Sequence, residues 1–216
     1  MPPLDMNWPP AVRTHFPALG HTFALTVDDG WTGASIEPFM VFAASNNLVP
    51  FTWFANGVGI RRIRESESAM AVLMERGLEI GYHTMTHPAV EDQRRNYNRA
   101  RWLDDYDEWK ALALETVGDR SYKVKPYARA AGGYFSTPFL EMCDERGLLP
   151  IGWSKDPYVL VRGEEIGPGD IFLTHFRYSE WRWFEHVREL RNQKLLWPGT
   201  VSALLETERR YGWKLR

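Results

Sequence analysis

Short apolar segments alternate with amphipathic segments along most of the chain. The apolar segments are rich in β-branched and aromatic residues, and turn-forming residues bound most of them, which is typical of buried β-strands. They predict six strands, at residues 21–27, 49–55, 78–83, 124–129, 148–153 and 170–176. Because helical segments separate most consecutive strands, we expect parallel strands joined by crossover helices.

The intervening segments place apolar residues at helical spacing. They predict helices at residues 35–47, 66–76, 91–117 and 137–146. Ser35 and Thr137 are candidate N-caps, and Gly77 and Gly147 follow two of these helices as C-terminal stops. At least six such units in one uninterrupted chain favour a closed α/β barrel, in a single domain spanning residues 1–216.

Composition and charge narrow the class of protein. Hydrophobic residues make up 44% and charged residues 25% of the chain, which excludes a disordered or fibrous protein. The net charge of −2 and the pI near 6.3 provide no basic surface for nucleic acid. No apolar run approaches the ~18 residues of a membrane span. Cys143 is the only cysteine, so no internal disulfide is possible.

Polar residues with catalytic potential follow the predicted strands. In a parallel α/β barrel the active site forms at the carboxyl ends of the strands, so these side chains are expected to converge. They are Asp28, Asp29 and Trp31, then His83 and His87, then Arg129, then Trp153 and Asp156, and finally His175. Each feature alone is common in surface loops, and their joint occurrence at strand ends indicates a candidate site.

His83 and His87 are four residues apart, which on a helical turn places both imidazoles within reach of one ion. Two histidines and one carboxylate form a common catalytic zinc site. One of Asp28 and Asp29 would be the third ligand and the other the general base, while His175 could protonate a leaving group. Thr84 stands where a zinc metalloprotease would have its glutamate, which disfavours that class. The set suits hydrolysis of an amide or ester.

These segments resemble the motifs of the polysaccharide deacetylase family, carbohydrate esterase family four. ALTVDDG (24–30) is similar to the family's first motif, and EIGYHTMTHP (79–88) is similar to its histidine motif. YARAAGGY (127–134) stands where the arginine motif belongs, and IFLTH (171–175) resembles the last motif. The order and spacing extend over residues 21–176.

The resemblance implies a distorted, TIM-barrel-like (β/α) barrel with about seven parallel strands and one divalent ion, usually Zn²⁺, with Co²⁺ as an alternative. It also implies a reaction, the removal of N-acetyl or O-acetyl groups from a polysaccharide such as peptidoglycan or chitin. The implied metal ligands are Asp29, His83 and His87. The other implied roles are Asp28 as base, His175 as acid, Arg129 as the residue that orients Asp28, Leu173 in the acetyl pocket, and the Gly132 N–H as oxyanion donor.

Two departures from the family pattern keep a second function open. Ala130 to Gly133 follow Arg129 where the family usually has two prolines, a tyrosine and a glycine, and GWSKDPY (152–158) only loosely matches the fourth motif. Asp156 is a candidate partner of His175. The second function is a carbohydrate-binding or structural domain with lost turnover. A third, a metal amidohydrolase of small cyclic or nucleobase-like amides, is disfavoured because the histidine motif resembles the polymer deacetylases more closely.

The ten tryptophans suit either a sugar-binding surface or an aromatic core. For Trp31 and Trp153 both interpretations stay open, whereas Trp102, Tyr106 and Trp109 have the spacing of a buried helical stripe. Cys143 is expected to be core packing. A polymer deacetylase would act outside the cytoplasm, yet MPPLDMNWPPAVRTHF lacks the apolar segment of a signal peptide. Removal of the signal, or delivery by a larger secreted or phage assembly, would account for this.

Overall fold

A parallel sheet built around the buried strand β1 (Thr22–Asp29) organises the chain. The structure is a computed structural model that describes residues 8–17, 20–31, 33–48, 50–75 and 77–211. The strands of its sheet follow the order β5-β4-β3-β2-β1-β6, and β7 also pairs with β1. The other strands are β2 (Thr52–Ala55), β3 (Glu79–Tyr82), β4 (Val124–Ala128), β5 (Leu149–Pro150), β6 (Ile171–His175) and β7 (Trp197–Gly199).

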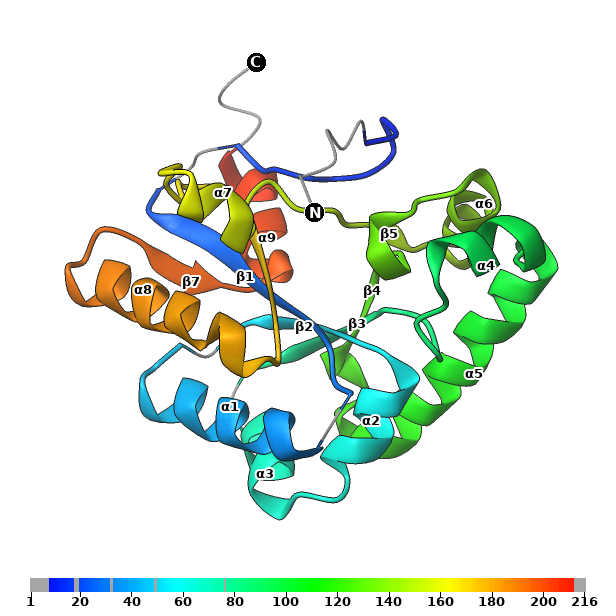
Figure 1. Cartoon of the computed structure of the whole chain (residues 1–216), viewed down its shortest axis with the longest axis horizontal. Helices are drawn as coiled ribbons and strands as arrows, with labels where there is room; N and C mark the ends of the chain where they lie inside the picture. The colour runs from blue at the N-terminus through cyan, green and yellow to red at the C-terminus, as the bar shows by residue number, and fades with distance from the viewer. Residues whose placement is uncertain (1–7, 18–19, 32, 49, 76, 212–216) are drawn as a thin grey trace.

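The helices lie around the strands (Figure 1). The α-helices are α1 (Gly33–Ser45), α2 (Gly57–Ile63), α3 (Glu67–Glu75), α4 (Val90–Asn96), α5 (Arg99–Val117), α6 (Thr137–Arg146), α7 (Pro157–Val161), α8 (Trp181–Asn192) and α9 (Val201–Tyr211). The described residues also form the short 3₁₀ segments η1 (Gly118–Lys123), η2 (Ala131–Gly133) and η3 (Tyr178–Glu180). Within the described ranges, no helix combines the length and the hydropathy needed to span a membrane.

β1 occupies the centre because seven of its eight residues are buried, as expected of a strand covered on both faces. It pairs in parallel with β2 on one edge and with β6 on the other. The register sets Asp28 opposite Phe54 of β2 and opposite His175 of β6. Two of the residues singled out from the sequence are thereby neighbours in the sheet.

The expected distorted barrel of parallel strands is confirmed, but its ring is not closed by a continuous ladder. Between β5 and β6 the described residues provide an isolated bridge, Lys155 with Phe172. The N–H of Ser154 donates to Ile171 O at 3.0 Å, and the N–H of Leu173 donates to Lys155 O at 2.8 Å. This short seam brings the chain after β5 against the strand that carries His175.

Several predicted boundaries are wrong by a few residues. Helix α1 begins at Gly33, so Ser35 lies inside it, and the side chain that caps α6 belongs to Ser136 rather than Thr137. The segment 91–117 is two helices, because Asn98 caps α5 by accepting from Arg101 N–H. β7 was not predicted. Val49 and Arg76, at the ends of predicted elements, lie outside the described residues.

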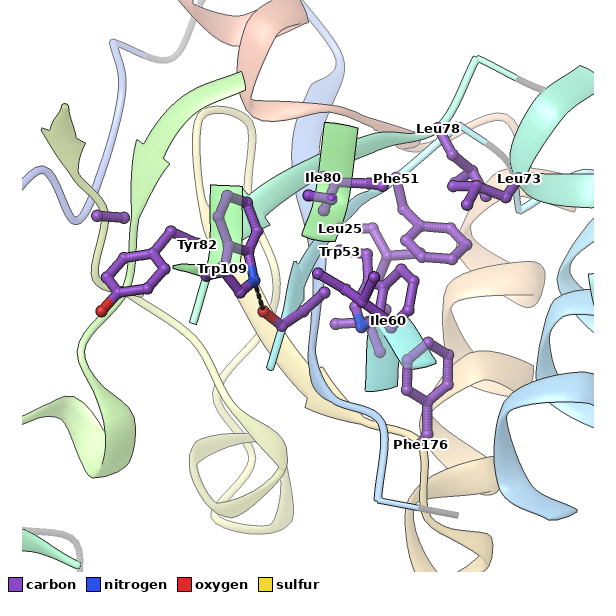
Figure 2. Packing of buried hydrophobic residues seen from close by; sticks show 14 of the residues in the cluster. Leu25, Phe51, Trp53, Ile60, Leu73, Leu78, Ile80, Tyr82, Trp109 and Phe176 are labelled. Atoms are coloured by element: carbon purple, nitrogen blue, oxygen red, sulfur yellow. Dashed lines mark hydrogen bonds between the residues drawn. The ribbon is translucent and has the colours of Figure 1, made fainter. Parts of the chain in front are cut away.

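Aromatic rings from the sheet and from α5 pack together with aliphatic side chains in the core, as Trp53, Tyr82 and Trp109 do in Figure 2. Trp102, Tyr106 and Trp109 are all buried, which confirms the predicted stripe. Trp109 also donates a hydrogen bond from Nε1 to Ala55 O at 2.7 Å, at the end of β2. Cys143 is buried as expected, and burial raises the pKa of its thiol to about 12, so it is not a reactive nucleophile.

Replacing Trp109 by phenylalanine should destabilise the fold more than the matched change Trp102→Phe. Both tryptophans are fully buried on α5 and lose the same volume. Only Trp109 gives up a hydrogen bond, because Trp102 Nε1 has no hydrogen-bond partner among the described residues. The expected difference in the free energy of unfolding, measured in urea, is about 1 kcal/mol. Equal losses would show that this hydrogen bond does not contribute to stability.

Candidate functional site

A pocket of about 770 Å³ lies at the carboxyl ends of the strands. Its lining residues come from β1, from the segment after β3, from η2, from the segment between β5 and α7, from α7 itself, from β6, and from η3 and α8. Nine of the residues predicted from the sequence line it: Asp28, Asp29, His83, His87, Gly132, Trp153, Asp156, Leu173 and His175. The structure therefore brings together residues that are spread over most of the chain.

The end of β1 turns so that Asp28 and Asp29 both reach the pocket. Successive side chains of an extended strand point to opposite faces, but Asp29 has a left-handed backbone with φ of 73°. Trp53 fixes this turn by donating from Nε1 to Asp29 O at 2.7 Å. Gly30 follows with φ of 134°, and a Cβ there would lie 2.6 Å from Gly59 Cα, so only glycine fits.

The segment from His83 to His87 is not the expected helical turn. Thr84 and His87 have left-handed backbones, with φ of 65° and 51°. A β-branched residue rarely adopts this conformation, so the surroundings must hold it. Thr84 Oγ1 accepts from the His87 N–H at 2.9 Å, and Asp105 Oδ1 of α5 accepts from the Met85 N–H at 2.9 Å. The imidazoles still converge, with ring centroids 5.0 Å apart.

Asp29, His83 and His87 form a set that could hold a metal ion. Their ligand atoms lie within 4.8 Å of one another. Asp29 Oδ1 is 3.5 Å from His83 Nε2 and 3.4 Å from His87 Nε2. His83 Nδ1 is 2.9 Å from Arg129 O, so an Nδ1–H donates there and leaves the lone pair of Nε2 for a metal.

The burial and charge of this set fit a cation. Asp29 Oδ1 is buried and has no hydrogen-bond partner among the described residues, which is costly unless something binds it. Burial opposes ionisation of Asp29, but His83 and His87 outweigh it and hold the pKa of Asp29 well below its usual range. Burial likewise lowers the pKa of His83, yet Asp28 and Asp29 outweigh that effect and raise it. The carboxylates therefore attract positive charge to this point.

Asp28 is held by the buried guanidinium of Arg129, as the resemblance implied. Arg129 is fully buried and donates from Nη1 to Asp28 Oδ1 at 2.7 Å. It also donates to Thr26 Oγ1, to Ile151 O and to Gly152 O, at distances of 2.7–3.1 Å. Burial lowers the pKa of Arg129, although Asp28 opposes this shift. The other oxygen of Asp28 lies 3.6 Å from His83 Nε2.

The partner of His175 is Glu180 of η3 rather than Asp156. The two carboxylate oxygens of Glu180 lie 3.1 and 3.2 Å from His175 Nδ1. Burial lowers the pKa of His175, but Glu180 and the aspartates outweigh it and raise the pKa. Asp156 instead caps α7 by accepting from the N–H groups of Tyr158 and Val159.

The remaining predicted residues occupy different parts of the site. Leu173 lines the pocket and is buried. Trp153 lines the pocket too, and its Nε1 is 3.3 Å from Asp156 Oδ2. Trp31 is 42% exposed and its ring lies edge-on to His87, with centroids 5.5 Å apart, so it is not core packing. Gly132 lines the pocket with φ of 62°.

Among the residues of this site that sequence reasoning missed, three charged side chains lie next to the predicted ones. Glu180 lies in a polar segment and Asp105 lies in a predicted helix, and neither pattern reveals which group the side chain contacts. The third, Arg177, follows β6 and approaches Asp29 Oδ2 at 3.8 Å. The only sequence signal for Glu180 and Arg177 was that they lie close to His175 along the chain. For Asp105, the only signal was its position directly before Tyr106, a residue of the predicted buried stripe.

Comparison with known proteins identifies the family and the fold. The family model for polysaccharide deacetylase matches residues 17–148. A family 4 carbohydrate esterase from Bacillus anthracis is 19% identical, with a TM-score of 0.72 over 91% of this chain and 88% of that one. The peptidoglycan deacetylase PdaC from Bacillus subtilis is 17% identical, with a TM-score of 0.71 over 90% and 95% of the two chains.

A third similar structure is a family 4 pseudoenzyme from Bacillus anthracis. It is 19% identical, with a TM-score of 0.71 over 92% of this chain and 70% of that one. None of the curated protein sequences matches the chain. At these identities the solved structures show a shared fold.

Replacing His87 by alanine should abolish binding of a divalent metal ion. The change removes one of three side chains that converge on one point, so the affinity should fall by more than roughly 100-fold. His21→Ala, at an exposed histidine before β1, is the matched control and should leave the affinity unchanged. Elemental analysis after dialysis against zinc measures the outcome, with circular dichroism to confirm the fold. Full occupancy in a folded His87→Ala protein would contradict this site.

Proposed function

The chain belongs to the polysaccharide deacetylase family, and from this premise we propose that it is a metal-dependent hydrolase that removes acetyl groups from a polysaccharide. The observation that carries the proposal is the buried Oδ1 of Asp29, which has no hydrogen-bond partner among the described residues and faces two histidine nitrogens. A carboxylate–guanidinium contact, Asp28 with Arg129, and a histidine–carboxylate contact, His175 with Glu180, flank that atom. One pocket thus contains residues suited to hold a metal, accept a proton and donate one.

We assign Asp29, His83 and His87 as the ligands of Zn²⁺ or another divalent cation such as Co²⁺. The donor set of two imidazoles and one carboxylate is a common one for catalytic zinc. When bound, such an ion polarises a carbonyl oxygen and acidifies water. Arg129 supports the set through its backbone oxygen, which fixes the ring of His83.

Asp28 is the proposed general base. Arg129 holds one oxygen of its carboxylate at 2.7 Å and thereby fixes the plane of the group. The other oxygen faces the ligand set, where it can accept the proton of the attacking water. Substituting the amide of asparagine would preserve the shape of this side chain and remove its basicity.

His175 is the proposed general acid. Because Glu180 accepts from Nδ1, the protonated ring presents its Nε2–H to the pocket. Glu180 raises the pKa of His175 and so keeps the ring protonated at higher pH. The Nε2 proton can then pass to the leaving nitrogen or oxygen of the substrate.

The walls of the pocket suggest how an acetylated sugar is held. Leu173 would contact the acetyl methyl group, and Trp153 and Trp31 offer aromatic surfaces for sugar faces. The N–H of Gly132 is the proposed donor to the oxyanion of the intermediate. Its φ of 62° is closed to proline, so a proline variant cannot test this donor without distorting the segment.

The second candidate function is a carbohydrate-binding domain without turnover. It is favoured by the altered segment Ala130 to Gly133 after Arg129. One of the similar solved structures is that of a pseudoenzyme. Against it, the described pocket retains Asp28, Asp29, both histidines and His175 in contact with suitable partners. We therefore favour the hydrolase, acting on an extracytoplasmic polymer such as peptidoglycan.

The zinc-loaded protein should release acetate from N-acetylated polysaccharides, and Asp28→Asn should lower the rate by about 10²–10⁴-fold while zinc stays bound. The reason is that an amide cannot accept the proton of water. Acetate release and zinc content measured on the same samples separate the two effects. Loss of zinc from Asp28→Asn, with zinc retained by Asp29→Ala, would reverse the two roles. Absence of acetate release from every polymer would favour the binding domain.

Glu180→Gln should move the alkaline limb of the pH–activity profile to lower pH. His175 acts in its protonated form, so activity falls as the pH rises through its pKa. Removing the Glu180 carboxylate removes a cause of the raised pKa, so the fall should begin earlier. Asp156→Asn is the matched control and should leave this limb in place, because Asp156 contacts α7 instead. A shift in the control alone would assign the partnership to Asp156.

A further inference from the structure

Three arginines line the outer part of the pocket. Arg162 ends α7, Arg177 follows β6, and Arg182 lies in the first turn of α8. All three are exposed, and about half of the side chains of Arg162 and Arg177 is accessible, 51% and 56%. They come from separate segments, so the cluster exists only in the folded protein.

The carboxylates in this pocket are already held by the protein. Asp28 is bound by Arg129, and Asp29 faces the two histidines. Asp156 accepts two backbone N–H groups of α7, at 2.8 and 3.1 Å. Glu180 accepts from His175, from the hydroxyl of Thr174 and from the His175 N–H. None of these carboxylates therefore depends for its charge balance on the three arginines, which we call the rim arginines.

The three arginines, in contrast, have no close anionic partner among the described residues. Arg177 is 3.8 Å from Asp29, whose charge an ion would take up. Arg162 is 3.9 Å from Glu164, which Lys155 binds more closely at 2.8 Å. The guanidinium of Arg182 lies over the ring of Trp183, 4.6 Å from its centroid. Their donors therefore face solvent beside the pocket.

We infer that the polysaccharide bound here is anionic and carries carboxylates next to the sugar that is deacetylated. This inference rests on the proposed function and distinguishes an acidic polymer from a neutral one such as chitin. Guanidinium groups present paired N–H donors that match a carboxylate. Tyr158 and Val161 on α7, exposed by 62% and 65%, provide apolar surface beside these donors for sugar faces.

The test compares one polymer with and without its charge. Peptide-free peptidoglycan glycan strands carry a lactyl carboxylate on alternate sugars, and carbodiimide coupling to ammonia converts these groups to neutral amides. Binding of both forms to zinc-loaded Asp28→Asn protein, which should not consume them, is measured by calorimetry. The carboxylate form should bind about tenfold tighter at low salt, and the preference should disappear at about 0.5 M salt.

Variants of the rim arginines test whether these residues cause the preference for the carboxylate form. Arg162→Gln and Arg182→Gln should each weaken binding of the carboxylate form by up to about fivefold and leave the amidated form unchanged. Arg120→Gln, at an exposed arginine before β4 and away from the pocket, is the matched control and should change neither. A polymer of alternating N-acetylglucosamine and glucuronate, tested with its amidated form, distinguishes a ring carboxylate from a lactyl one. A preference for charge in either pair supports the inference.

The inference about charge and the proposed hydrolase activity can fail independently, because binding and acetate release are measured separately. Equal binding of the charged and amidated forms in both pairs would overturn the inference, even if the wild-type protein releases acetate from them. A preference that the arginine variants do not reduce would overturn it as well. A preference that they abolish, without acetate release from any polymer, would uphold the inference and reject the proposed hydrolase.

Discussion

The burial of one positive charge, the guanidinium of Arg129, is the constraint around which the site is built. Removing a charge from water costs several kcal/mol, so its donors must all be paired. They are paired with Asp28 and Thr26 of β1 and with two carbonyl groups after β5. Its backbone N–H donates to Tyr82 O, and its backbone O accepts from His83. A single residue thus fixes the proposed base and one proposed metal ligand, and joins β1, β3, β4 and the end of β5.

Most of the fold could be predicted because the strands are buried and parallel. Such strands are continuous apolar runs, which are visible in one sequence. β7 escaped detection because it consists of Trp197, Pro198 and Gly199, and two of these residues are unfavourable in strands. β5 is shorter than expected, since the residues after Pro150 form isolated bridges instead. The break at Asn98 was hidden because residues on both sides keep helical periodicity.

The identity of the candidate site was more predictable than its geometry. Strand ends placed the aspartates and histidines together without knowledge of any contact. The left-handed backbones of Asp29, Thr84 and His87 cannot be read from the sequence. They are held by Trp53, Asp105 and neighbouring groups, which belong to other parts of the fold. Glu180 and the rim arginines were missed for the same reason: only the packing of α7, η3 and α8 reveals what they face.

The central position of β1 has a consequence for synthesis of the chain. One edge of β1 pairs with β2, which ends at Ala55. The other edge pairs with β6, which is complete only when His175 has been synthesised. At roughly 5–20 residues per second, a ribosome needs about 6–24 s for the ~120 residues between them. Once His87 has been added, the nascent chain contains every proposed metal ligand, while an apolar strand edge still lacks its partner and can pair with other chains. Exposure to aggregation is therefore greatest in this interval rather than in the finished barrel.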